Sequence, residues 1–245
     1  MIFRSGLLCA GIVLLSLSAS PAHAIFNVVS TGIEEGVAGI ESRNRFDHDD
    51  RVGEDGFRAD TIKLDYGITK RWQMELALNW EDIPQHGYNY ASTEVESKFR
   101  FYDPGDYWLD FSMKLAYEIA HESGVADAAK TKLQFAKKFE KWDHTANLNF
   151  SKEVGKDATK DITSSFAWRT RYAANEHFKP SIEYFASLGE WVDMPSYNDQ
   201  AHRIGPVVYG NLTPEIGYKL GYLFGLSKAA EDGSFKAFLS YEFML

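Results

Sequence analysis

Apolar and polar residues alternate along most of this chain, and this period of two constrains the fold more than any other feature. In the clearest segment, 72–80, the apolar face carries Trp72, Met74, Leu76, Leu78 and Trp80. Successive side chains of a β-strand point to opposite faces, so the alternation predicts strands rather than helices. Because the pattern recurs up to the last residue, the sequence predicts an all-β protein.

The alternation predicts twelve strands. They lie near 36–46, 57–68, 71–81, 93–102, 107–119, 129–139, 142–153, 162–172, 178–188, 203–211, 216–227 and 234–245. The connections between them alternate between short and long, with the long polar ones near 47–56, 82–92, 120–128, 154–161, 189–202 and 228–233. Consecutive strands joined in this way predict an antiparallel up-and-down arrangement without a second domain.

The first 24 residues have the pattern of a secretory signal peptide. Arg4 supplies the positive start, residues 6–17 form an apolar stretch, and Ala22-His23-Ala24 provides small residues on both sides of a cleavage position. We therefore expect cleavage after Ala24, which divides the chain into a signal peptide, 1–24, and one exported domain, 25–245.

Composition excludes several classes of function for the exported domain. The single cysteine, Cys9, lies in the predicted signal, so the domain has no thiol for disulfides, iron–sulfur clusters or nucleophilic catalysis. Without Arg4, 25 basic residues face 35 acidic ones, and this net charge of −10 argues against nucleic-acid binding. No phosphate-binding glycine loop or metal motif is present, so we expect no cofactor.

Several features predict that the apolar faces of the strands meet lipid. Strands of about 10 residues suit a tilted crossing of a membrane, whereas strands of soluble proteins have about 5–6 residues. Aromatic residues lie near the ends of the apolar faces, as in the pairs Trp72/Trp80 and Tyr107/Tyr117. A barrel of about twelve strands is also too wide for side chains to fill, so its interior would hold water and polar groups. The predicted fold is a transmembrane antiparallel β-barrel.

The chain resembles Gram-negative outer-membrane β-barrel proteins. A signal peptide, twelve alternating strands and a final strand ending in Tyr241-Glu242-Phe243-Met244-Leu245 carry the resemblance, although such barrels usually end in an aromatic residue. Segments 66–72, 101–105 and 221–226 are similar to those of transporter-like barrels of the phenol-degradation "MetA-pathway" type. The resemblance implies an outer-membrane location, contact with outer-membrane lipid, assembly by the barrel assembly machinery, and a role in transport.

The polar faces of the strands are unusually rich in charge, with a small excess of basic residues. We predict that these faces line the lumen, and the candidate pore residues are Lys63, Lys98, Arg100, Lys114, Lys130, Lys132, Arg169, Arg171, Lys219, Glu75, Asp110 and Glu183. Charged rings and ladders set the selectivity of aqueous pores. We therefore expect a narrow channel, or porin, for small polar or anionic solutes.

Two other functions fit the same sequence. If opposite charges on the polar faces pair with one another, the barrel would be a non-conducting structural or adhesive protein. Histidines and aspartates in the long connections, among them His48 and Asp50, could instead form an external hydrolytic or metal site. No Gly-x-Ser-x-Gly motif or closely spaced histidine pair supports this site, so we expect no enzyme.

Overall fold

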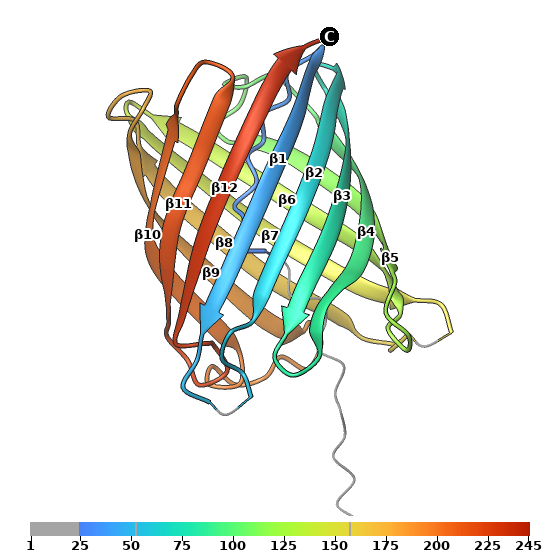
Figure 1. Cartoon of the computed structure of the whole chain (residues 1–245). Helices are drawn as coiled ribbons and strands as arrows, with labels where there is room; N and C mark the ends of the chain where they lie inside the picture. The colour runs from blue at the N-terminus through green and yellow to red at the C-terminus, as the bar shows by residue number, and fades with distance from the viewer. Residues whose placement is uncertain (1–24, 52, 157) are drawn as a thin grey trace, which may run out of the picture.

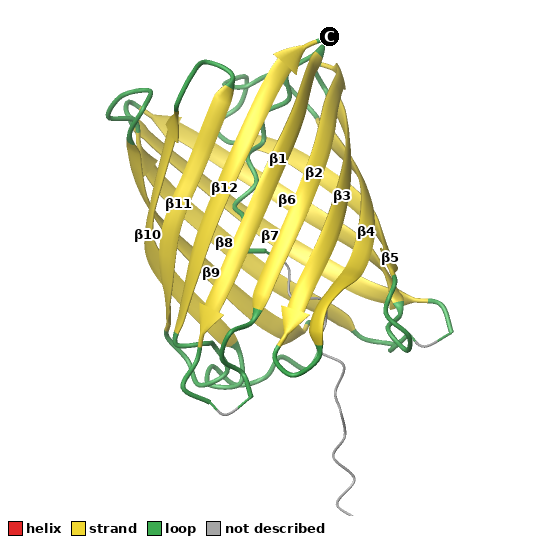
Figure 2. Cartoon of the chain, in the orientation of Figure 1, coloured by secondary structure: helices red, strands yellow, loops and turns green. Residues whose placement is uncertain are grey.

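The computed structural model describes residues 25–51, 53–156 and 158–245, so the predicted signal peptide lies outside the described residues. The described residues form strands, turns and loops, without a helix (Figure 2). The strands are β1 (Val37–His48), β2 (Arg58–Thr69), β3 (Trp72–Ile83), β4 (Gly87–Arg100), β5 (Asp110–Ala120), β6 (Asp127–Phe139), β7 (Trp142–Val154), β8 (Ile162–Tyr172), β9 (Lys179–Glu190), β10 (Ala201–Asn211), β11 (Ile216–Gly225) and β12 (Gly233–Met244). Among the described residues, no helix is long and apolar enough to cross a membrane.

The twelve strands form one closed antiparallel barrel, as the sequence predicted. Each strand pairs with its neighbours in the chain, and β1 closes the sheet by pairing with β12 from Val37↔Met244 to His48↔Gly233 (Figure 1). Closure gives every strand two neighbours, so no edge is left with unpaired backbone groups. Only a closed sheet or a helix satisfies the backbone in a medium without water.

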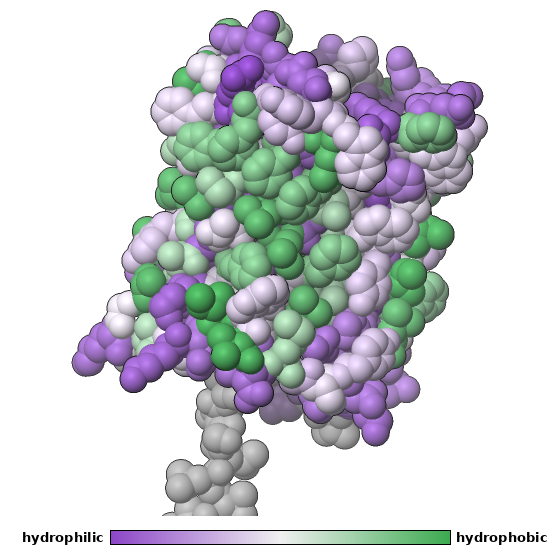
Figure 3. All heavy atoms as spheres, turned by 180° about the vertical axis from the view of Figure 1, so that it is seen from behind, coloured by the Kyte–Doolittle hydropathy of each residue, from purple (hydrophilic) through white to green (hydrophobic). Residues whose placement is uncertain are grey.

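The outer surface of the barrel carries an apolar band. Large apolar side chains that point outward remain 40–53 % exposed in the middle of the strands; examples are Ile40, Leu115, Ile182, Leu220 and Leu239. In the space-filling view, hydrophobic residues occupy the middle of the wall and hydrophilic residues gather at both ends (Figure 3). An apolar belt between two polar rims is the surface expected of a barrel in a bilayer.

The predicted long connection at 82–92 is wrong. Strands β3 and β4 both continue into this region, and only residues 84–86 separate them. A bulge shifts the register where Asn79 and Trp80 pair with β4, so the alternation along β4 changes phase between Tyr90 and Ser92. Tyr90 therefore packs on Trp80, with 5.3 Å between the ring centroids, while Ser92 is buried. An extra residue in a strand breaks the period of two, which hid this part of β4.

The apolar belt predicts a position-dependent cost for charge on the outer surface. We expect Leu220→Lys, in the middle of β11, to destabilise the barrel in lipid vesicles by about 2–4 kcal/mol, because lysine is costly at the centre of a bilayer. Leu212→Lys, in the turn before β11, is the matched control and should cost about 1 kcal/mol or less. Urea unfolding in vesicles measures both, and equal costs would contradict a lipid-facing wall.

Candidate functional site

The chain before β1 lies inside the barrel. Residues 25–35, which we call the luminal segment, precede Gly36, whose N–H donates to the Gly67 carbonyl at the end of β2. From this end, where the short turns and the C-terminus lie, the segment descends through the interior behind β12 and β1 (Figure 1). Four of its side chains, Phe26, Val28, Thr31 and Ile33, are at most 8 % exposed.

Three side chains of the barrel wall hold the backbone of the luminal segment at different depths. Lys98 on β4 donates to the Gly32 carbonyl at 2.5 Å, and Lys236 on β12 donates to the Phe26 carbonyl at 2.8 Å. Between them, Asn147 on β7 accepts from the Val29 N–H at 2.7 Å and donates to the Val29 carbonyl at 2.9 Å. These bonds fix the segment along much of the barrel's length.

The ring of Phe26 packs between two arginines and a phenylalanine of the barrel wall. The guanidinium carbons of Arg45 and Arg203 lie 3.9 and 4.6 Å from its centroid, and the Phe185 ring is 5.2 Å away. Phe26 and Val28 also belong to a buried cluster with Ala167, Phe185, Val207, Tyr209 and Leu223. Strands β8 to β11 thus supply an apolar interior against which the segment packs, a feature that the charge pattern of the sequence did not reveal.

Charges fill the opposite side of the lumen in pairs. Lys114 on β5 lies 2.7 Å from Glu75 on β3 and 2.5 Å from Glu96 on β4, and Lys130 on β6 lies 2.6 Å from Glu118. An ion pair between β5 and β3 has to cross the inner face of β4, so these side chains point into the barrel. Pairing of this kind offsets the cost of removing charges from water.

A second group of pairs lies on the strands that surround the luminal segment. Lys236 is 2.5 Å from Glu183 on β9, and both side chains are fully buried. The Tyr209 hydroxyl also donates to Glu183. Lys219 on β11 reaches Glu41 on β1 at 2.9 Å. Most candidate pore residues are therefore bound to opposite charges rather than free to attract a solute.

The remaining candidate pore residues differ in position. Arg169 and Arg171 share Asp143, at 3.3 and 2.8 Å, and Lys63 lies between Asp65 and Glu75, at 2.8 and 3.2 Å. Two candidates lie at the rim with the short turns rather than deep in the lumen. Arg100 pairs with Asp103, and Asp110 accepts from the Gly105 N–H. Lys132 differs from the other basic residues in this group, because it enters no ion pair among the described residues.

Lys132 lines a cavity beside the luminal segment. The cavity is partly open to solvent. Segment residues Ile25, Asn27 and Val29 form one side of it. The charged lining comes from β1 to β6: Arg43, Asp60, Glu81, Glu94, Glu96, Lys114, Glu118, Lys130 and Lys132. Four basic and five acidic residues give this space a nearly balanced charge.

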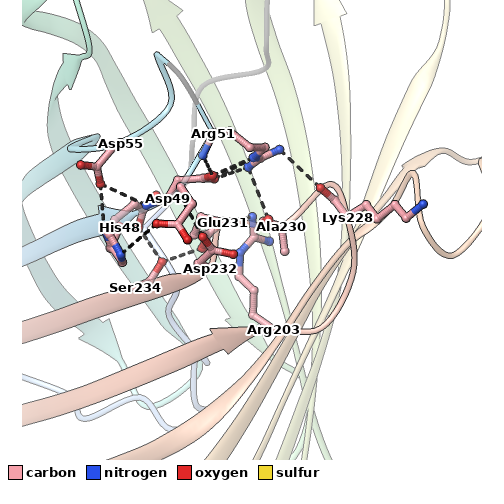
Figure 4. A network of polar contacts seen from close by, with 12 residues as sticks. His48, Asp49, Arg51, Asp55, Arg203, Lys228, Ala230, Glu231, Asp232 and Ser234 are labelled. Atoms are coloured by element: carbon pink, nitrogen blue, oxygen red, sulfur yellow. Dashed lines mark hydrogen bonds and ion pairs between the residues drawn. The ribbon is translucent and has the colours of Figure 1, made fainter.

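Two loops meet at the other end of the barrel. Figure 4 shows loop 49–57 joined to loop 226–232 by polar contacts. The Arg51 guanidinium binds Asp49 and donates to the Lys228 carbonyl, and the Asp50 N–H donates to Asp232. Behind them, Glu231 turns inward to accept two hydrogen bonds of 2.5 Å from Arg203. These contacts join the two loops to each other and to the inner wall of the barrel.

The histidines of the predicted loops do not form a common site among the described residues, and His202 lies in β10. His48 lies 3.0 Å from Asp55 and 3.7 Å from Asp50, and it is well exposed. His121 stacks on Tyr90, while His202 bonds to Tyr184 and Gln200 elsewhere on the rim. Among residues 25–51, 53–156 and 158–245, no group of three histidine, cysteine, aspartate or glutamate side chains is arranged to hold a metal ion.

Comparison with known proteins shows the fold. No family model matches the chain, and no curated protein matches its sequence. Solved structures with a similar barrel include the NanC porin, which has a TM-score of 0.59 and 11 % sequence identity over 82 % of this chain and 98 % of its own. The KdgM porin has a TM-score of 0.54 and 11 % identity over 84 % of this chain and 99 % of its own. The COG4313 outer membrane channel from Pseudomonas putida F1 has a TM-score of 0.62 and 10 % identity over 86 % of this chain and 97 % of its own. This chain has the fold of outer-membrane porins and channels. The similarity to MetA-pathway barrels stays a prediction.

The contacts of Glu231 predict that the stability of the fold depends on pH. Burial raises the pKa of Glu231, but hydrogen bonds from Arg203 and the charges of Arg203 and Arg45 outweigh it and lower the pKa from 4.5 to about 2. A carboxyl group whose pKa is lower in the folded than in the unfolded protein stabilises the fold at a pH above the pKa of the unfolded state. This stabilisation is lost as the pH falls towards the pKa of the folded state. We therefore expect Glu231→Gln to be less stable than the wild type at pH 7, with the difference shrinking between pH 5 and pH 2. Thermal unfolding measures it; Asp193→Asn, in an exposed loop, should show no such convergence.

The buried Lys236–Glu183 pair predicts a large and partly reversible loss of stability. Lys236→Met should cost about 3–5 kcal/mol, because it leaves Glu183 buried without its cation. Adding Glu183→Gln should recover most of this loss, and the remainder reports the lost hydrogen bond to the Phe26 carbonyl. Urea unfolding followed by tryptophan fluorescence gives the values, with the exposed Lys228→Met as control. Additive effects of the two substitutions would show that the pair is not coupled.

Proposed function

We propose that this protein is an outer-membrane channel that passes small polar or anionic solutes through a narrow route beside the luminal segment. One observation carries the proposal: charged and polar side chains make up most of the lining of the solvent-open cavity between the segment and strands β1 to β6. Solutes that exchange water for alternating ammonium and carboxylate groups can enter such a space without a large desolvation cost.

The ammonium group of Lys132, which forms no ion pair among the described residues, favours anions within this route. Paired charges present little net field to a passing ion, whereas a lysine without a carboxylate partner attracts an anion directly. Because acidic residues outnumber basic ones by one in the cavity lining, the preference for anions rests on Lys132 and is modest. We therefore place the specificity of the channel at Lys132 and its neighbours, and not at Arg169 and Arg171, which Asp143 neutralises in part.

A non-conducting barrel is the second candidate function, and two observations favour it. Cations on β5, β6 and β12 are paired with carboxylates on β3, β5 and β9, and the luminal segment fills the space next to β8 to β11. A structural or adhesive barrel needs no more than this. The solved porins and channels of the same fold do not support an enzyme, so we propose no catalytic activity.

The proposed channel resides in the outer membrane of a Gram-negative bacterium, after cleavage of the signal peptide behind Ala24. The exposed apolar belt supports contact with outer-membrane lipid. The alternating C-terminal strand β12, with Phe243 near its end, supports delivery by the barrel assembly machinery. A role like that of MetA-pathway transporters is part of this proposal.

Bilayer recordings distinguish the two candidates. The refolded exported domain should give discrete current steps and a reversal potential on the anion side under a salt gradient. Lys132→Glu should move the reversal potential towards cations. Lys137→Glu, on the outer face against Trp108, is the matched control and should not move it. A folded barrel that carries no current would favour the structural role, and an open channel indifferent to Lys132→Glu would remove this residue from the route.

A further inference from the structure

We infer that the lumen contains a binding site for an extended peptide and that the luminal segment is its displaceable occupant. The segment is then a ligand supplied by the same chain, and its presence closes the part of the lumen next to β8 to β11. The binding site stands on the contacts described above. Only the consequence for conduction depends on the proposed channel function.

The contacts recognise a peptide backbone rather than particular side chains. Lys98 and Lys236 bind carbonyl oxygens, and Asn147 binds both the N–H and the carbonyl of Val29. A side-chain amide that binds both the N–H and the carbonyl of one residue recognises an extended main chain. The pocket of Arg45, Arg203 and Phe185 adds one side-chain preference, for the aromatic ring of the second residue, Phe26.

Lys98 shows that the wall is built for this occupant. Its side chain is 3 % exposed, and among the described residues it forms no ion pair; its hydrogen bond goes to the Gly32 carbonyl. A buried ammonium group without an acceptor is costly. The nearby buried cation Lys114, in contrast, has both Glu75 and Glu96 on the wall. The position of Lys98 is therefore explained by a carbonyl that the segment brings, and not by the barrel alone.

The luminal segment is separable from the barrel. It belongs to none of the twelve strands, and the sheet closes from β12 to β1 without it. At the short-turn end the next residue, Gly36, donates to the Gly67 carbonyl and accepts from the Leu245 N–H. A side chain at Gly67 would collide with the Glu34 carbonyl, so glycine there lets the chain turn from β1 into the lumen. A segment outside the ladder can leave without breaking the sheet.

Thiol labelling tests whether the wall contacts hold the segment. In a chain beginning at Ile25, Val28→Cys provides the single thiol, and Val28 is 3 % exposed in place. We expect slow labelling by a charged thiol reagent, and about tenfold faster labelling after Lys98→Met with Asn147→Leu, since each change removes a buried hydrogen-bond partner. Lys130→Met is the matched control, because its partners Glu94 and Glu118 both lie on the wall.

Peptide binding tests whether the site accepts the segment from outside. A fluorescent peptide with the sequence of residues 25–35 is added to a barrel that lacks residues 25–33, after heat-modifiable gel migration has shown that this barrel is folded. We expect saturable binding that restores the low current of the intact chain. The same peptide with proline in place of Val29 is the control, since proline has no N–H to donate to Asn147.

The outcomes separate this inference from the proposed channel. Saturable binding of the natural peptide, with at least about tenfold weaker binding of the proline peptide, supports the site even if neither barrel conducts. Failure of a folded barrel to bind the peptide, or equal binding of both peptides, would overturn it. Labelling of Val28→Cys that is fast in the otherwise unchanged chain would also overturn it, because the segment would then not occupy the lumen.

Discussion

Backbone hydrogen bonding is the constraint on which the rest of this structure depends. A sheet with an apolar outer surface cannot leave peptide groups unpaired, because lipid offers them no partner. The pairing of β1 with β12 removes the last two edges, and the twelve strands then fix the width of the barrel. The outward residues of each strand consequently form the belt, and the inward residues face a space too wide for them to fill alone.

Two different solutions fill that space. Between β3 and β6 many inward side chains are charged, and Lys114 and Lys130 reach over a neighbouring strand to bind Glu75 and Glu94. Between β8 and β11 the inward side chains include Val207, Tyr209 and Leu223, and the luminal segment packs against them. The solvent-open cavity lies at the boundary between these halves. The proposed route for solutes and the proposed peptide site thus both follow from a lumen that is charged on one side and apolar on the other.

The sequence predicted the architecture well and the interior only in part. The number of strands, their antiparallel order and the outward apolar face follow from alternation. The β3–β4 hairpin was misjudged because a bulge near Trp80 changes the phase, and the connection between β4 and β5 covers residues 101–109, longer than predicted. The sequence also named Lys114, Glu75 and Glu183 as inward residues, yet it did not indicate their partners. Glu231 and Asn147 carried no signal at all, since one lies in a loop and the other resembles any polar strand residue.

What the sequence by itself determined is everything that repeats with a period of two: strands, faces and the closed barrel that such strands must form in lipid. Only the tertiary structure decided which inward charges meet, because Lys236 and Glu183 come together across two intervening strands. It also decided where residues 25–35 lie, because a segment without periodicity gives no indication of the residues that it contacts. The physical reason is the same in both cases. Alternation is a local property of the chain, whereas the contents of the lumen depend on the distance across a barrel that exists only after closure.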